Sequence, residues 1–149
     1  MIPGIERVSS APGTVTVAVR KVLVVDEALP VRRKLLDILH RAGVPASEVK
    51  MAEHAEEALA IFALEHPTLV FCELVGEASR GLEMVLEMLT VDPQSKIVLV
   101  TAEDPASPLV RQAIRAGVFG VILKPLRHEA IRSILAELGS EEGGIERFR

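Results

Sequence analysis

The sequence of 149 residues contains no tryptophan and no tyrosine, and it has a single cysteine. Without these two aromatic residues there is little to stack on a flavin ring, which disfavours flavin binding. One cysteine cannot form an internal disulfide, which agrees with a reducing cytoplasm. Cys72 lies in an apolar stretch without an apparent activating base, so we predict an inert buried thiol and not a nucleophile.

The sequence also lacks an excess of positive charge and any long apolar run. Its 17 Lys and Arg are outnumbered by 21 Asp and Glu, and the formal net charge is −4. Nucleic acid and anionic membrane surfaces are therefore disfavoured as partners. No run approaches the roughly 20 apolar residues that span a bilayer, and the N-terminus does not resemble a signal peptide. We expect a cytoplasmic protein.

What the sequence does contain is an alternation of short apolar runs and longer segments of helical period. The runs lack polar alternation, as is typical of strands buried on both faces, and fall at residues 21–25, 49–52, 68–72, 96–100 and 120–123. The segments of helical period are 30–42, 55–66, 81–90, 107–116 and 127–138. This alternation predicts an α/β fold, a doubly wound parallel sheet with five flanking helices and a crevice at the carboxyl ends of the strands.

The predicted sheet defines three parts of the chain. Residues 1–19 contain little patterned apolar sequence and are expected to be a flexible N-terminal arm, although residues 15–19 could instead add a strand. Residues 20–139 form the predicted domain. Residues 140–149, with Gly143 and Gly144, are expected to be a loose C-terminal tail.

Polar residues follow four of the predicted strands, at the edge where this architecture binds ligands. Asp26 and Glu27 follow the first strand, and Glu73 follows the third. Thr101 and Ala102 follow the fourth strand, and Lys124 follows the fifth. Each alone has an ordinary explanation, such as helix capping or a solvated lysine beside a turn. Together they would gather carboxylates, a hydroxyl and an ammonium in one crevice, and such hard oxygen donors suit Mg²⁺.

These residues also carry a family resemblance that spans about residues 21–138. Residues 22–27 resemble the first strand and acidic pair of response-regulator receiver domains, and residues 28–33 read like the first helix of chemotaxis-type stand-alone receivers. Residues 67–73 align with the strand that ends in the phosphate-accepting aspartate. The family's remaining markers are matched by Gly81, Thr101-Ala102 and Lys124-Pro125.

The resemblance implies a fold and a role for each site residue. The fold is flavodoxin-like, with five parallel strands in the order 2-1-3-4-5. Mg²⁺ would be held by Asp26, Glu27, Glu73 and the carbonyl of Val75. Phosphate-contact positions would be Thr101, Ala102 and Lys124, and the Lys-Pro bond is typically cis.

The chain departs from the family pattern at three positions. The phosphoacceptor position is Glu73 instead of aspartate, Glu77 replaces a usual proline, and Val121 replaces the aromatic residue that acts with Thr101 as the activation switch. Phosphoryl transfer needs in-line geometry, and glutamate reaches roughly 1.5 Å farther than aspartate. The longer carboxylate would pair with Lys124 or Thr101. Three outcomes remain open: an uncoupled or permanently set receiver, a weakly phosphorylatable one, or one regulated by another ligand.

We therefore expect an atypical single-domain receiver that acts as a phosphorylation-independent protein-interaction module and not as an enzyme. The resemblance implies that its partner is an effector or a histidine-kinase-pathway protein, or a second copy. The partner face would comprise the fourth helix, fifth strand and fifth helix, with arginines at Arg111, Arg115, Arg127 and Arg132. The alternative is a phosphate-ester hydrolase or nucleotide-binding domain, which is disfavoured because no Gly-rich phosphate loop follows the first strand.

Overall fold

Five parallel strands form the central sheet in the computed structural model, which describes residues 5–11, 14–19, 21–74, 76 and 80–139. The strands are β3 (Val22–Val25), β4 (Val49–Ala52), β5 (Leu69–Cys72), β6 (Lys96–Thr101) and β7 (Gly120–Leu123). Their spatial order is β4-β3-β5-β6-β7. In chain order this is 2-1-3-4-5, so the predicted doubly wound fold is confirmed.

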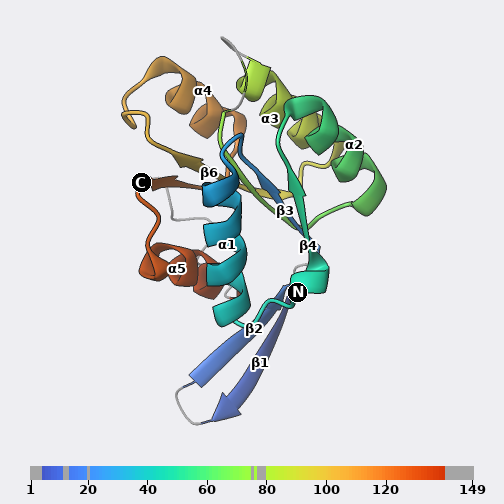
Figure 1. Cartoon of the computed structure of the whole chain (residues 1–149), viewed down its shortest axis with the longest axis vertical. Coiled ribbons are helices and arrows are strands. Elements are labelled where there is room, and N and C mark those ends of the chain that lie inside the picture. Colours follow the sequence, from blue (N-terminus) through green and yellow to red (C-terminus); the bar gives the residue numbers. More distant parts are fainter. Residues whose placement is uncertain (1–4, 12–13, 20, 75, 77–79, 140–149) are drawn as a thin grey trace.

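Helices cover both faces of this sheet (Figure 1). They are α1 (Leu29–Arg41), α2 (Ala55–Glu65), α3 (Arg80–Val91), α4 (Pro108–Ala116) and α5 (His128–Gly139), with a short 3-10 turn η1 (Ala46–Glu48). The first and fifth helices pack on one face, and the other three lie side by side on the opposite face. Successive strands are added on one side of β3 for β4 and on its other side for β5, β6 and β7, so right-handed crossovers place helices on both faces. No helix within the described ranges has the length and apolar content to cross a membrane.

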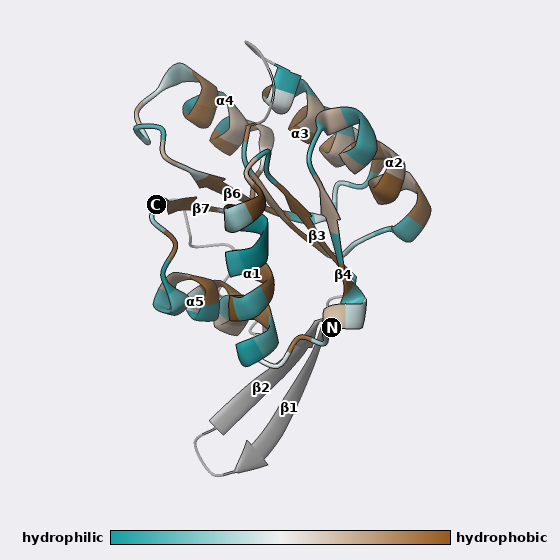
Figure 2. Cartoon of the chain, viewed as in Figure 1, coloured by the Kyte–Doolittle hydropathy of each residue, from teal (hydrophilic) through white to brown (hydrophobic). Residues whose placement is uncertain are grey.

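The hydrophobic core consists of two halves, one on each face of the sheet. Along β3, Val22 and Val24 point into the half beneath α1 and α5, while Leu23 and Val25 point into the half beneath α2, α3 and α4. All four side chains are buried, because successive residues of a strand face opposite sides. Figure 2 shows the resulting pattern, with hydrophobic strands in the centre. Each fully buried Val or Leu contributes about 1.5–3 kcal/mol.

Local signals in the sequence set the ends of the helices. Pro30 lies in the first turn of α1, where its missing N–H removes no helical hydrogen bond. Gly43 follows α1 and Gly117 ends α4, with φ of +101° and +114°. These values lie in the left-handed region that glycine adopts without strain, so the helices end where the sequence predicts.

A two-stranded antiparallel hairpin precedes the sheet and lies against α5. It is formed by β1 (Ile5–Ala11) and β2 (Thr14–Val19). The structure thus differs from the expectation of a flexible arm at residues 1–19, and β2 corresponds to the alternative of a strand at 15–19. Val and Thr favour extended backbone, and the pairing satisfies N–H and C=O groups that a single strand would leave open. The predicted tail at 140–149 lies outside the described residues.

Candidate functional site

Backbone hydrogen bonds align the carboxyl ends of four strands into one edge. The N–H of Glu73 donates to the carbonyl of Val25 at 2.9 Å, and the N–H of Lys124 donates to the carbonyl of Thr101 at 2.8 Å. Asp26 directly follows β3, and its backbone N–H donates to the carbonyl of Ala52, at the end of β4, at 3.2 Å. These bonds fix the backbone positions from which the predicted polar side chains emerge.

The ammonium group of Lys124 lies between two carboxylates at this edge. Its Nζ is 3.0 Å from Oδ2 of Asp26 and 3.2 Å from Oε2 of Glu73. The second oxygen of each carboxylate accepts a backbone N–H at 2.9 Å, from Ala28 for Asp26 and from Leu74 for Glu73. Each acid therefore uses one oxygen to hold its own loop and presents the other to the lysine.

The charge state of Lys124 follows from two opposing effects. Partial burial works to lower its pKa, but hydrogen bonds to Asp26 and Glu73, with the negative charge of both groups, raise the pKa above its ordinary value of 10.5. The lysine is thus cationic at neutral pH. It offsets the repulsion between two acids of which Asp26 is almost fully buried.

A pocket of about 750 Å³ opens beside Glu73, whereas Asp26 and Lys124 are not among the residues that line it. The predicted residues that line it are Glu27, Glu73, Thr101 and Ala102. Thr101 is buried, and its hydroxyl accepts the N–H of Glu103 at 3.0 Å, so it caps its own loop. Glu103 and Asp104 also line the pocket and are exposed. They were missed in the sequence, although they directly follow Thr101-Ala102, and they make the rim acidic.

Another residue that sequence reasoning did not assign to the site is Arg32, on α1. Its Nη1 donates to the backbone carbonyl of Asp26 at 2.6 Å, and its Nη2 lies 3.9 Å from Oε2 of Glu53. The side chain is only 11% exposed. Arg33 and Lys34, its neighbours in a basic cluster, are exposed. Of the three, Arg32 is therefore the one that braces the loop after β3.

The predicted metal site fits this arrangement only in part. Asp26 and Glu73 converge on Lys124, but Glu27 is exposed. Within the part of the chain that the structure describes, no three His, Cys, Asp or Glu side chains are grouped closely enough to hold a metal ion. The fourth predicted ligand, Val75, lies outside the described residues. The Mg²⁺ site stays a prediction, and the cation placed between Asp26 and Glu73 is the lysine ammonium.

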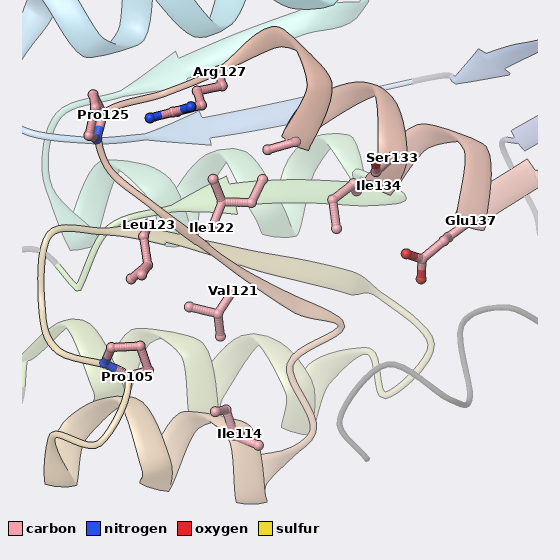
Figure 3. A pocket seen from close by; sticks show the side chains of 11 residues that line it. Pro105, Ile114, Val121, Ile122, Leu123, Pro125, Arg127, Ser133, Ile134 and Glu137 are labelled. Carbon is pink, nitrogen blue, oxygen red and sulfur yellow. The ribbon is translucent and has the colours of Figure 1, made fainter.

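Val121, at the predicted switch position, lines a different cavity. This groove of about 620 Å³ runs along β7 between α4 and α5 (Figure 3), and it shares no lining residue with the acidic pocket. Arg127 lines it, while Arg111, Arg115 and Arg132 are exposed on the same two helices. Of the four predicted arginines, Arg127 is thus the one that borders the groove, and none lines the acidic pocket that contains Glu73.

Cys72 ends β5 and is fully buried. Burial raises the pKa of its thiol, and the negative charges of Glu73 and Asp26 raise it further. The predicted inert thiol is therefore consistent with its surroundings, since a protonated buried thiol is a poor nucleophile.

Comparisons with known proteins match the same part of the chain. The model of the family described as response regulator receiver domain matches residues 22–136. Chemotaxis protein CheY of Thermotoga maritima is 29% identical over 108 residues, 72% of this chain and 88% of that protein. Protein CcdB of Bacillus subtilis is 30% identical over 112 residues, covering 74% and 90%. The structure of Vibrio cholerae chemotaxis protein CheY4 superposes with a TM-score of 0.66 at 26% identity, covering 78% and 96%.

Proposed function

Because this chain belongs to the response regulator receiver domain family, we propose that it is an atypical receiver of two-component signalling that works without phosphorylation. Receiver domains are generally non-enzymatic signalling modules. The observation that carries the proposal is the ion pair between Glu73 and Lys124, with 3.2 Å between Oε2 and Nζ. In this proposal, the molecule acts by binding another protein. The arrangement of its acidic pocket is fixed by its own side chains and not by a phosphoryl group.

The chemistry of Glu73 supports this function. Its extra methylene carries the carboxylate roughly 1.5 Å farther into the pocket than aspartate would. The ammonium that contacts the phosphoryl group in active family members is here paired with Glu73 itself. A carboxylate has about one negative charge, against nearly two for a phosphate, so it reproduces only part of the phosphorylated state.

Magnesium has a limited place in this function. Receiver domains generally bind Mg²⁺ at the phosphorylation site, and here Asp26, Glu27 and Glu73 would hold it, with the carbonyl of Val75. The ion would supply positive charge among acidic groups. Lys124 already supplies such charge to Asp26 and Glu73, and the proposed function includes no step through the metal.

Treatment with a small-molecule phosphodonor, followed by intact mass measurement, tests the proposal. We expect no stable mass increase on the parent protein and a phosphoryl adduct on Glu73→Asp, which restores the shorter acid. Glu73→Gln is the matched control, because it keeps the length and removes the nucleophile. Labelling of the parent at Glu73 would overturn the proposal in favour of a weakly phosphorylatable receiver. That alternative is supported by the presence of Lys124 and Thr101, the residues at the phosphate-contact positions.

The proposed partner is an effector or a kinase-pathway protein, bound through the face of α4, β7 and α5. The exposed arginines on this face would attract an acidic surface. Charge reversal at Arg111 and Arg115 should reduce capture of the partner in a pulldown. Reversal at Arg33, exposed on α1, is the control. Equal capture by all variants would place the partner on another surface.

A further inference from the structure

The two outer edges of the central sheet differ in charge. Within the described residues, β4 pairs with β3 alone at one edge, and β7 pairs with β6 alone at the other. Lys50 on β4 is exposed, and a charged side chain on an edge strand disfavours pairing with another chain. β7 has the sequence Gly-Val-Ile-Leu without a charged residue, and Leu123 is 48% exposed. The β7 edge is therefore the one that lacks this protection.

The backbone of β7 presents hydrogen-bonding groups at this open edge. The N–H of Lys124 donates to the carbonyl of Thr101, at the end of β6, at 2.8 Å. Because the backbone groups of successive strand residues point in alternate directions, those of Val121 and Leu123 point away from β6. On that side they have no backbone partner among the residues that the structure describes. Their N–H and C=O groups are thus available to an added strand.

An apolar groove runs along the same edge. The cavity of about 620 Å³ is lined by the consecutive residues 121–123 of β7. Since successive side chains of a strand point to opposite faces, contact with all of them places the cavity at the edge and not over one face. Ile114 on α4 and Ile134 on α5 lie on its two sides (Figure 3). Its wall from Arg127 to Glu137 is about 15 Å long, which accommodates about four extended residues.

Charge distinguishes between two possible occupants of this edge. The helix α4 carries Arg111 and Arg115 and no acidic residue. A second copy that continued the sheet by antiparallel pairing at β7 would place its own α4 on the same face, so that like charges would be opposed. A strand with acidic side chains instead complements these arginines and Arg127, which lines the groove. Charge therefore favours a strand of another protein over a second copy.

We propose that the partner adds an extended, acidic and apolar segment to the open edge of β7. Its backbone pairs with Val121 and Leu123, its apolar side chains enter the groove, and its acidic side chains face the arginines. In such strand addition the backbone hydrogen bonds supply affinity, and pockets for alternate side chains supply specificity. The inference rests on the proposed function, in which the chain acts by binding another protein, and adds the chemistry of the segment that is bound.

Nuclear magnetic resonance on the isotope-labelled full chain tests the proposal, with a synthetic peptide of alternating valine and glutamate as the probe. We expect the amide signals of Val121 and Leu123 to shift to saturation, while those of Lys50 and Met51 at the other edge stay unchanged. The same peptide with N-methylated amides on its pairing edge keeps its side chains but loses hydrogen-bond donors, so its binding should weaken about tenfold. Unshifted Val121 and Leu123 signals, or equal binding of the N-methylated peptide, would overturn the proposal.

Variants and dilution separate this proposal from its alternatives. Charge reversal at Arg111 and Arg115 should weaken binding of the acidic peptide, whereas reversal at Arg33, exposed on α1, should not. Equal binding by these variants would contradict the proposed charge pairing. Val121 signals that move when the protein alone is diluted would assign the edge to a second copy and reject the proposal. None of these readouts involves phosphorylation, so labelling of the parent by a phosphodonor would refute the proposed function separately.

Discussion

Replacing Lys124 with methionine is expected to destabilise the fold, because two acids lose their shared cation. Methionine keeps most of the apolar stem and removes the charge. The side chain of Asp26 is 5% exposed, while those of Lys124 and Glu73 are 22% and 21% exposed. Removing one partner of a fully buried pair costs about 3–5 kcal/mol, and partial exposure of the lysine reduces this. We expect a loss of about 2 kcal/mol in the free energy of unfolding.

The assay is urea denaturation followed by far-ultraviolet circular dichroism, because the chain has no tryptophan or tyrosine for intrinsic fluorescence. A double-mutant cycle with Asp26→Asn isolates the pair. In the Asp26→Asn background, Lys124→Met should lower the free energy of unfolding by less than it does in the parent. The reason is that one of the two carboxylates left without a cation is then already neutral. A cost below about 0.5 kcal/mol, typical of a surface substitution, would refute the reasoning. So would additivity of the two substitutions.

Two further predictions concern groups outside the pocket. The hydrogen bond from Arg80 lowers the pKa of Glu56 below its ordinary value of 4.5. The pair therefore stabilises the fold above pH 4.5, and this stabilisation is lost as the pH falls through the lowered pKa. Arg80→Met should therefore be less stable than the parent near neutral pH, with the two converging in acid; a gap that persists in acid would contradict this. Because Cys72 is buried with a raised pKa, a thiol reagent should label it only after unfolding; rapid labelling of the native protein would show that β5 opens locally.

The strands and helices were predictable because one physical signal dominates each of them. Strands such as β5 are apolar without alternation, since both faces are covered, and helix ends coincide with residues such as Gly117 that suit a left-handed stop. The hairpin before β3 was harder to predict, because antiparallel pairing depends on a partner strand that a local pattern does not reveal. The short Val and Thr alternation at residues 15–19 was the available signal.

Predicting the site from sequence was limited by side-chain direction. Strand topology brings Asp26, Glu73 and Lys124 to one edge, and this was readable from their positions after predicted strands. The role of Arg32 was not readable, because three consecutive basic residues point in different directions around a helix and only the packed structure selects one.

The sequence left open whether Glu73 would pair with Lys124 or with Thr101, and the structure favours the lysine. The Thr101 hydroxyl accepts a hydrogen bond from its own loop, whereas the Glu73 carboxylate lies 3.2 Å from the ammonium. Val121, the other switch position, lines the groove and not the acidic pocket. Transmission from pocket to partner face needs an element with two arrangements that both sites bias. Val121 offers no ring to move between two such arrangements, so the aromatic switch of the family is missing at this position.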